Sequence, residues 1–176
     1  QSELSIVVPS ELVPLPSLGK IYPSGSPLAD RETIEIKAMT TREEDILMSQ
    51  ALIKKGTVVT ELIKACLVDP NIDVSSLLSG DRNALMIAIR ASGYGQTYEP
   101  TYVCPECSFK NDLKIDLNQI PIKPLAIDPV GTGLNEFEFK LPMTGKRVVF
   151  KFLTGREEEE ILAMTEMRKK KGLQAS

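Results

Sequence analysis

The sequence predicts an α+β fold. It would consist of an N-terminal extended arm, a small helical core of about three helices, a Cys-x-x-Cys β-hairpin, a second β-hairpin and a C-terminal helix. Apolar residues recur at helical spacing through residues 42–92, which indicates helices. Polar and apolar residues alternate on both sides of Cys104-x-x-Cys107 and again through residues 137–152, which indicates hairpins. The predicted parts of the chain are 1–32 (arm), 33–120 (helical core with the Cys-x-x-Cys hairpin) and 121–176 (hairpin and helix).

The predicted arm is rich in proline. Pro9, Pro14, Pro16, Pro23 and Pro27 are five of the 12 prolines of the chain, and proline disfavours both helices and central strands. The arm also carries more apolar residues than a solvated linker would, so we expect it to lie on a surface, its own chain's or a neighbour's. We expect it to be mobile in the isolated chain and ordered in an assembly. The candidate interaction residues in the arm are Leu15, Ile21 and Tyr22.

The start of the chain carries no basic segment leading into an apolar run. We therefore expect no signal peptide and, since the chain begins at Gln1, an N-terminus that has been trimmed.

The helical core begins with a strand that alternates polar and apolar residues. After it, Thr40 and Glu43 have the spacing of a capping box, so a helix should begin near Arg42. The last helix carries six consecutive apolar residues, Ala84 to Ile89, and we expect it to be buried nearly all round. The predicted strand and helices are 33–39, 42–55, 58–67 and 81–92.

Arg90 is a cation in this otherwise apolar helix, shortly before a glycine-rich turn that contains Tyr94. A guanidinium in such a place should be paired or lie at an interface. We expect it to be buried against a carboxylate or against backbone carbonyls near the turn. Arg90 and Tyr94 complete the set of candidate interaction residues.

Cys104 and Cys107 lie at the predicted tip of the first hairpin, and this pattern leaves three interpretations open. A zinc knuckle has this geometry, but zinc takes four ligands, the only other cysteine is Cys66, and the chain has no histidine. A redox pair is disfavoured because the motif joins two strands and does not precede a helix. A tight turn that keeps the cysteines of an ancestral knuckle, or that packs their thiols in a small apolar tip, is the simplest interpretation. We assign no cofactor and no metal, and keep Cys104 and Cys107 as candidate zinc ligands.

The second hairpin is predicted from the alternation of Phe137, Phe139 and Leu141 before a Pro-Met-Thr-Gly turn. The C-terminal helix should follow Thr154, with acidic residues in its first turn and the cations Arg168 to Lys171 in its last turn, where each favours the helix dipole. The basic cluster could equally bind phosphate or an acidic protein face.

Composition excludes several function classes. With no histidine, catalysis by Ser-His-Asp or Cys-His and zinc or haem ligation through histidine are unavailable. A net charge of -3 gives no overall attraction to nucleic acid. No apolar run approaches the roughly 18 to 20 residues of a membrane helix. Three cysteines build no disulfide scaffold, which indicates a reducing compartment. We therefore expect no enzyme, no small-molecule substrate and no membrane or nucleic-acid partner.

The order of the motifs resembles that of the T4-type baseplate protein family of contractile-tailed bacteriophages, whose T4 member is a baseplate hub component or hub-assembly protein. The resemblance covers most of residues 15–120 and depends on order and spacing, because each motif is short. The motifs are Leu15-Pro16-Ser17-Leu18-Gly19-Lys20-Ile21-Tyr22-Pro23, Met39-Thr40-Thr41-Arg42-Glu43-Glu44-Asp45-Ile46-Leu47, Leu62-Ile63-Lys64-Ala65-Cys66 with Asp81, Ile89-Arg90-Ala91-Ser92-Gly93-Tyr94-Gly95, and Cys104-Pro105-Glu106-Cys107 ahead of Asp116-Leu117.

The resemblance implies a non-enzymatic structural or assembly protein of the tail baseplate. It implies other baseplate and tail proteins as partners, and a location in the virion, with the host cytoplasm during assembly. The alternative hypothesis is a zinc-ribbon-type adaptor that binds nucleic acid or the transcription machinery through the Cys-x-x-Cys hairpin and the Arg168 to Lys171 cluster. The incomplete ligand set and the acidic balance argue against this alternative.

Overall fold

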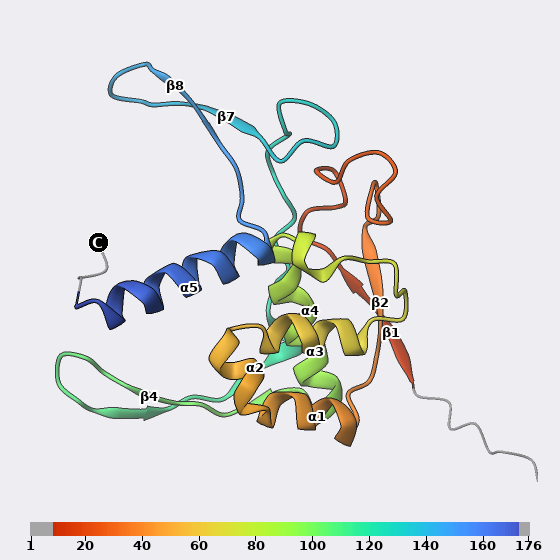
Figure 1. Cartoon of the computed structure of the whole chain (residues 1–176), viewed down its shortest axis with the longest axis vertical. Helices are drawn as coiled ribbons and strands as arrows, with labels where there is room; N and C mark the ends of the chain where they lie inside the picture. Colours follow the sequence, from red (N-terminus) through yellow and green to blue (C-terminus); the bar gives the residue numbers. More distant parts are fainter. Residues whose placement is uncertain (1–8, 173–176) are drawn as a thin grey trace, which may run out of the picture.

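The computed structural model describes residues 9–172, so residues 1–8 of the predicted arm and the last four residues of the chain lie outside the described part. The described chain mixes helices with antiparallel two-stranded ribbons, which confirms the predicted α+β class (Figure 1). The helices are α1 (Thr41–Met48), α2 (Gln50–Lys55), α3 (Val58–Cys66), α4 (Ser79–Tyr94) and α5 (Gly155–Lys170), with short 3-10 turns η1 (Val74–Ser76) and η2 (Leu117–Gln119). The strands are β1 (Ser10–Pro14), β2 (Thr33–Lys37), β3 (Thr97–Tyr98), β4 (Thr101–Val103), β5 (Lys110–Asp112), β6 (Ile115–Asp116), β7 (Phe137–Lys140) and β8 (Arg147–Phe150).

The segment expected to be a mobile arm is part of the chain's own fold from residue 9 onward. Strand β1 pairs antiparallel with β2, from Ser10 opposite Lys37 to Pro14 opposite Thr33. The prolines are compatible with this pairing because a two-stranded ribbon has only edge strands, and Pro14 lies at the end of its strand. Beyond β1, the apolar residues of residues 15–28 pack on the core, so of the two surfaces expected the arm lies on its own chain's. The expectation that the arm is mobile in the isolated chain is wrong for the described residues.

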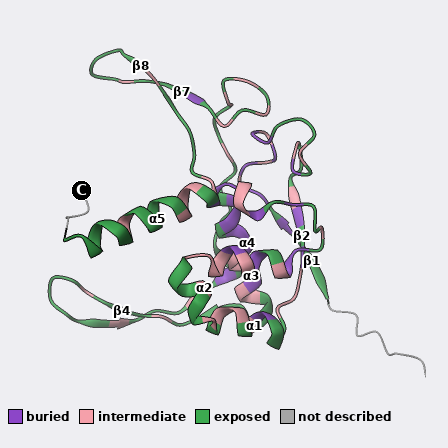
Figure 2. Ribbon diagram, viewed as in Figure 1, coloured by how far each residue is buried: buried purple, intermediate pink, exposed green. Residues whose placement is uncertain are grey.

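The core lies where the β1–β2 ribbon, α3 and α4 meet (Figure 2). It draws on the predicted arm through Leu15 and Leu28, on the helical part through Ile63 and Leu85, and on the C-terminal part through Phe137. The apolar run of α4 predicted a helix buried nearly all round, but only part of its surface is buried. It buries residues 81, 82, 84, 85 and 89, while residues 86–88 are half-buried.

Local signals placed most helix ends correctly. Helix α1 begins after Thr40 with the predicted capping box, in which Thr40 N donates to Glu43 Oε2 at 2.9 Å. The single helix expected over 42–55 is broken at Ser49, whose extended backbone separates α1 from α2. Gly56 ends α2 with a left-handed φ of 73°, a conformation that suits glycine. Helix α5 has the second capping box, between Thr154 and Glu157.

Three elements extend away from the core. The β7–β8 hairpin is confirmed, with Phe137 opposite Phe150, and projects at the top of Figure 1. The Cys-x-x-Cys hairpin is also confirmed, but Pro100 interrupts it, so that β3 pairs with β6 and β4 with β5. Its far end and α5 extend from the body toward the same side in Figure 1, and Figure 2 shows these three elements as mainly exposed.

Candidate interaction site

Asp81 is the centre of a buried polar cluster at the start of α4. Its side chain is 0% exposed and accepts two hydrogen bonds, from Ser17 N to Oδ1 at 2.9 Å and from the Tyr22 hydroxyl to Oδ2 at 2.6 Å. The Tyr22 oxygen in turn accepts a bond from Leu78 N at 3.1 Å. Burial, reinforced by the Asp81 charge, raises the pKa of the Tyr22 phenol above its usual value. The cluster therefore fastens residues 17–22 to α4.

This geometry corrects the role given to three candidate interaction residues. Leu15, Ile21 and Tyr22 are only 1%, 4% and 5% exposed. Their side chains pack inside the chain, so they stabilise its own fold and offer almost no surface to a partner.

Arg82 is a second buried charge that the sequence analysis missed. Its Nη1 donates to Thr60 Oγ1 at 3.0 Å and to the Val74 carbonyl at 3.4 Å, and its Nε lies 3.7 Å from Glu158 Oε2. Gly155 packs directly against the guanidinium. Arg82 thus joins α3, η1 and α4 to the first turn of α5. The spacing of the sequence could have revealed its burial. Arg82 lies three residues before Leu85 and seven before Ile89, so it shares the buried face of the helix with them.

Arg90 is half-buried, and its Nη1 donates to the Gly95 carbonyl at 3.3 Å. The expected carbonyl partner is confirmed and the expected full burial is wrong. The guanidinium carbon lies 4.8 Å from the ring centre of Tyr94 and 5.7 Å from that of Tyr98, within the range of a cation–π contact. Both tyrosines are exposed, Tyr94 by 51% and Tyr98 by 42%. Arg90 and Tyr94 therefore lie together on an accessible surface, and a role in interaction stays a prediction.

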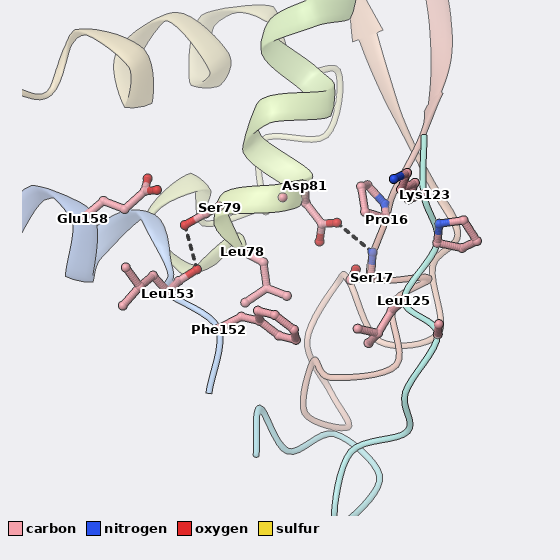
Figure 3. A pocket seen from close by; sticks show the side chains of 13 residues that line it. Pro16, Ser17, Leu78, Ser79, Asp81, Lys123, Leu125, Phe152, Leu153 and Glu158 are labelled. Carbon is pink, nitrogen blue, oxygen red and sulfur yellow. Dashed lines mark hydrogen bonds between the residues drawn. The ribbon is translucent and has the colours of Figure 1, made fainter. Parts of the chain in front are cut away.

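A pocket of about 520 Å³ lies between the start of α4 and the chain that leads into α5 (Figure 3). Its lining is mainly apolar, with Lys123 and Glu158 among the few charges. Two hydrogen bonds hold its walls, Ser17 N to Asp81 Oδ1 and Ser79 Oγ to the Leu153 carbonyl at 3.0 Å. The pocket is chemically suited to an apolar group. Its apolar lining includes Pro16, Leu78, Pro124, Leu125, Phe152 and Leu153.

The two cysteines of the first hairpin lie at its exposed end. Cys107 is exposed and Cys104 is partly exposed, so the interpretation of thiols packed in an apolar tip is wrong. The pKa of Cys104 lies below its usual value, because the backbone N–H groups of Cys107 and Glu106 and the Cys107 thiol donate to its sulfur. Burial raises the pKa of the third thiol, Cys66, to about 11. Cys66 is therefore an inert core residue.

Large apolar side chains are exposed on the three projecting elements. Met143, in the turn of the β7–β8 hairpin, is 94% exposed. On α5, Ile161, Met164 and Met167 recur every three positions and so share one side of the helix, and Leu162 is exposed as well. The members are Tyr102, Val103 and Phe109 on the first hairpin, Phe139, Met143 and Val149 on the second, and Ile161, Met164 and Met167 on α5. We call this set the exposed apolar surface.

Two further observations limit the chemistry of residues 9–172. No helix among them has both the length and the apolar character that crossing a membrane requires. Within the same residues, no three side chains of His, Cys, Asp or Glu come together as a metal site would require.

Comparison with known proteins gives one finding. The sequence model of the family described as T4 bacteriophage base plate protein matches residues 11–132. No curated protein and no solved structure matches the chain.

Proposed function

The chain belongs to the family of T4 bacteriophage base plate proteins, which makes it a structural protein of a phage tail baseplate, and on that premise we propose that it works without catalysis, through contacts with other tail proteins. We place it at the hub of the baseplate, in the finished virion, after assembly in the host cytoplasm. The partners are other baseplate and tail proteins.

The observation that carries this proposal is the exposed apolar surface. Soluble proteins that act alone rarely leave large apolar residues uncovered over extended areas, because burying them gains about 25 cal/mol per Å². Here the core is formed around α3 and α4, while most large apolar residues of the two hairpins and α5 are exposed (Figure 2). Projecting elements of this kind can be covered by neighbouring subunits without any change in the core.

The pocket beside Asp81 fits the same role. Its mainly apolar lining and its position near the start of α5 would receive an apolar side chain of a neighbour. The rigid Asp81 cluster would keep the pocket in shape before the neighbour arrives.

Complementation tests this function. Phage that lack the gene are supplied in trans with the wild-type chain or with a variant, and the yield of complete tails is counted. We expect Phe139→Ser with Met143→Ser, and separately Met164→Gln with Met167→Gln, to lower tail yield about tenfold or more, since each loses a partner contact worth at least about 1.4 kcal/mol. The unfolding midpoint of the purified variants should stay within the small range typical of surface changes.

Lys140→Ser and Lys170→Gln are the matched controls, because each replaces an exposed polar residue on the same element. They should support normal tail yield. Full tail yield from both apolar variants, or absence of the chain from purified tails and from tail intermediates, would overturn the proposal.

A further inference from the structure

The end of the first hairpin holds Cys104 and Cys107 in an ordered turn. Cys104 N donates to the Phe109 carbonyl at 2.9 Å, and Ser108 N donates back to the Cys104 carbonyl at 2.9 Å. Ser108 has a left-handed φ of 58°, which reverses the chain directly after Cys107. Two thiolates that each lie about 2.3 Å from one zinc ion must be close to each other. Cys104 and Cys107 are separated by two residues in this tight turn, which is the spacing of paired thiolate ligands in zinc knuckles.

The chain cannot complete a zinc site around this pair with thiolate or imidazole. The whole sequence has no histidine and only one further cysteine. That cysteine, Cys66, is 0% exposed in the core formed around α3, and among residues 9–172 no third metal-binding side chain joins Cys104 and Cys107. A structural zinc ion takes four ligands, and a second molecule can supply the other two as thiolates.

We propose that Cys104 and Cys107 form one half of a zinc site that a second copy of this chain completes with the same two cysteines. The result is a site of four cysteine thiolates on a two-fold axis, in which identical hairpin ends meet. A second copy supplies the missing ligands in the required number and kind. This inference goes beyond the proposed function and does not depend on it.

The surroundings of the pair favour this occupant. Tyr102, Val103 and Phe109 flank the cysteines and are exposed, the last by 65%. Two hairpin ends brought together would cover these side chains and would shield the metal from water. Binding displaces a proton from each thiol to the solvent and leaves a centre with a net charge of about -2. Lys110, next to Phe109 in both copies, offsets this charge.

The test uses the full chain, reduced and freed of metal, and titrates it with zinc sulfate. Light scattering after size-exclusion chromatography gives the mass, and elemental analysis gives the metal content. We expect a monomer without zinc and a dimer with about one zinc ion for every two chains. Cobalt(II) in place of zinc should give the intense visible absorption of a tetrahedral thiolate site.

Cys104→Ser and Cys107→Ser should each abolish metal uptake and dimerisation without changing the unfolding midpoint of the metal-free chain, because both residues lie at an exposed hairpin end. Cys66→Ala is the matched control and should dimerise with zinc as the wild type does. One zinc ion per monomer, a chain that stays monomeric with excess zinc, or dimerisation that survives Cys104→Ser would overturn the proposal. These outcomes concern zinc binding and dimerisation, whereas the complementation assay measures tail yield. Failure of one proposal therefore does not imply failure of the other.

Discussion

Tyr22 donates its hydroxyl proton to Asp81 Oδ2 at 2.6 Å, across 59 residues of sequence, and accepts the N–H of Leu78 with the same oxygen. One phenol therefore satisfies a buried carboxylate and an amide at the start of α4. Tyr22, which was expected to contact a partner, instead stabilises the chain's own fold.

Tyr22→Phe should destabilise the chain by roughly 1.5 to 3 kcal/mol, because it leaves the buried Asp81 charge short of a donor and the Leu78 amide without an acceptor. Urea unfolding followed by circular dichroism measures the change. Tyr102→Phe removes an exposed hydroxyl on the first hairpin and should stay within about 0.5 kcal/mol of wild type. Equal effects of the two changes would contradict the assigned role of Tyr22.

Leu15→Ala should cost about 2 to 5 kcal/mol, the usual range for a fully buried leucine. Leu12→Ala, three residues earlier, should cost little, because Leu12 is exposed. Thermal unfolding compares the two variants.

Because residues 15–28 pack in the core, deletion of residues 1–25 should unfold the isolated chain. Limited proteolysis of the wild type should spare the stretch between Pro9 and Pro27. If the deletion variant still folds, this prediction is wrong, and the mobile arm expected from the sequence is supported instead.

Gly155→Ala should destabilise the attachment of α5, although alanine favours helices over glycine by up to about 1 kcal/mol. A β-carbon at this position would collide with the Arg82 guanidinium, which is buried and bonded to Thr60, so we expect a net loss of about 1 to 3 kcal/mol. Gly80→Ala is the matched control. Its β-carbon would lie 3.9 Å from Pro16 Cβ, which is ordinary contact, and it should cause no loss. Hydrogen exchange of the α5 amides reports the attachment directly, and unchanged protection in Gly155→Ala would refute the prediction.

The start of α5 should be sensitive to acid. The Lys151 ammonium, together with the backbone N–H of Thr154, lowers the pKa of Glu157 from 4.5 to about 2. A carboxyl group with a lowered pKa contributes stability above its ordinary pKa, and that contribution is lost as the pH falls from about 4.5 towards 2. Glu157→Gln should therefore cost about 1 kcal/mol at neutral pH, as loss of a helix cap does, and progressively less below pH 4.5.

Unfolding of wild type and Glu157→Gln over this pH range tests the prediction. Glu166→Gln, at an exposed ion pair with Lys169 near the other end of α5, should show little dependence on pH. A constant difference between wild type and Glu157→Gln down to pH 2 would show that the Glu157 charge does not stabilise the fold. Added salt should reduce the Lys151 part of the effect, because that ammonium is largely exposed.

The sequence by itself determined the local features of this protein. The capping boxes at Thr40 and Thr154, the glycine end of α2 and the two later hairpins all depend on residues within a few positions of each other, so short-range spacing was sufficient. The same local reading found the Cys-x-x-Cys turn, though not that its thiols are exposed.

Only the tertiary structure decided where residues 9–31 lie and which charges are buried. Proline content correctly excluded helices there, but it says nothing about pairing with β2 or about bonds from Ser17 and Tyr22 to Asp81, which lies 59 to 64 residues away. In the same way, Arg90 stood out by its apolar neighbours, whereas Arg82 is the buried cation, because Thr60 and Glu158 approach it from other parts of the chain. Burial of a charge depends on partners brought together by folding, and a pattern confined to one helix does not contain them.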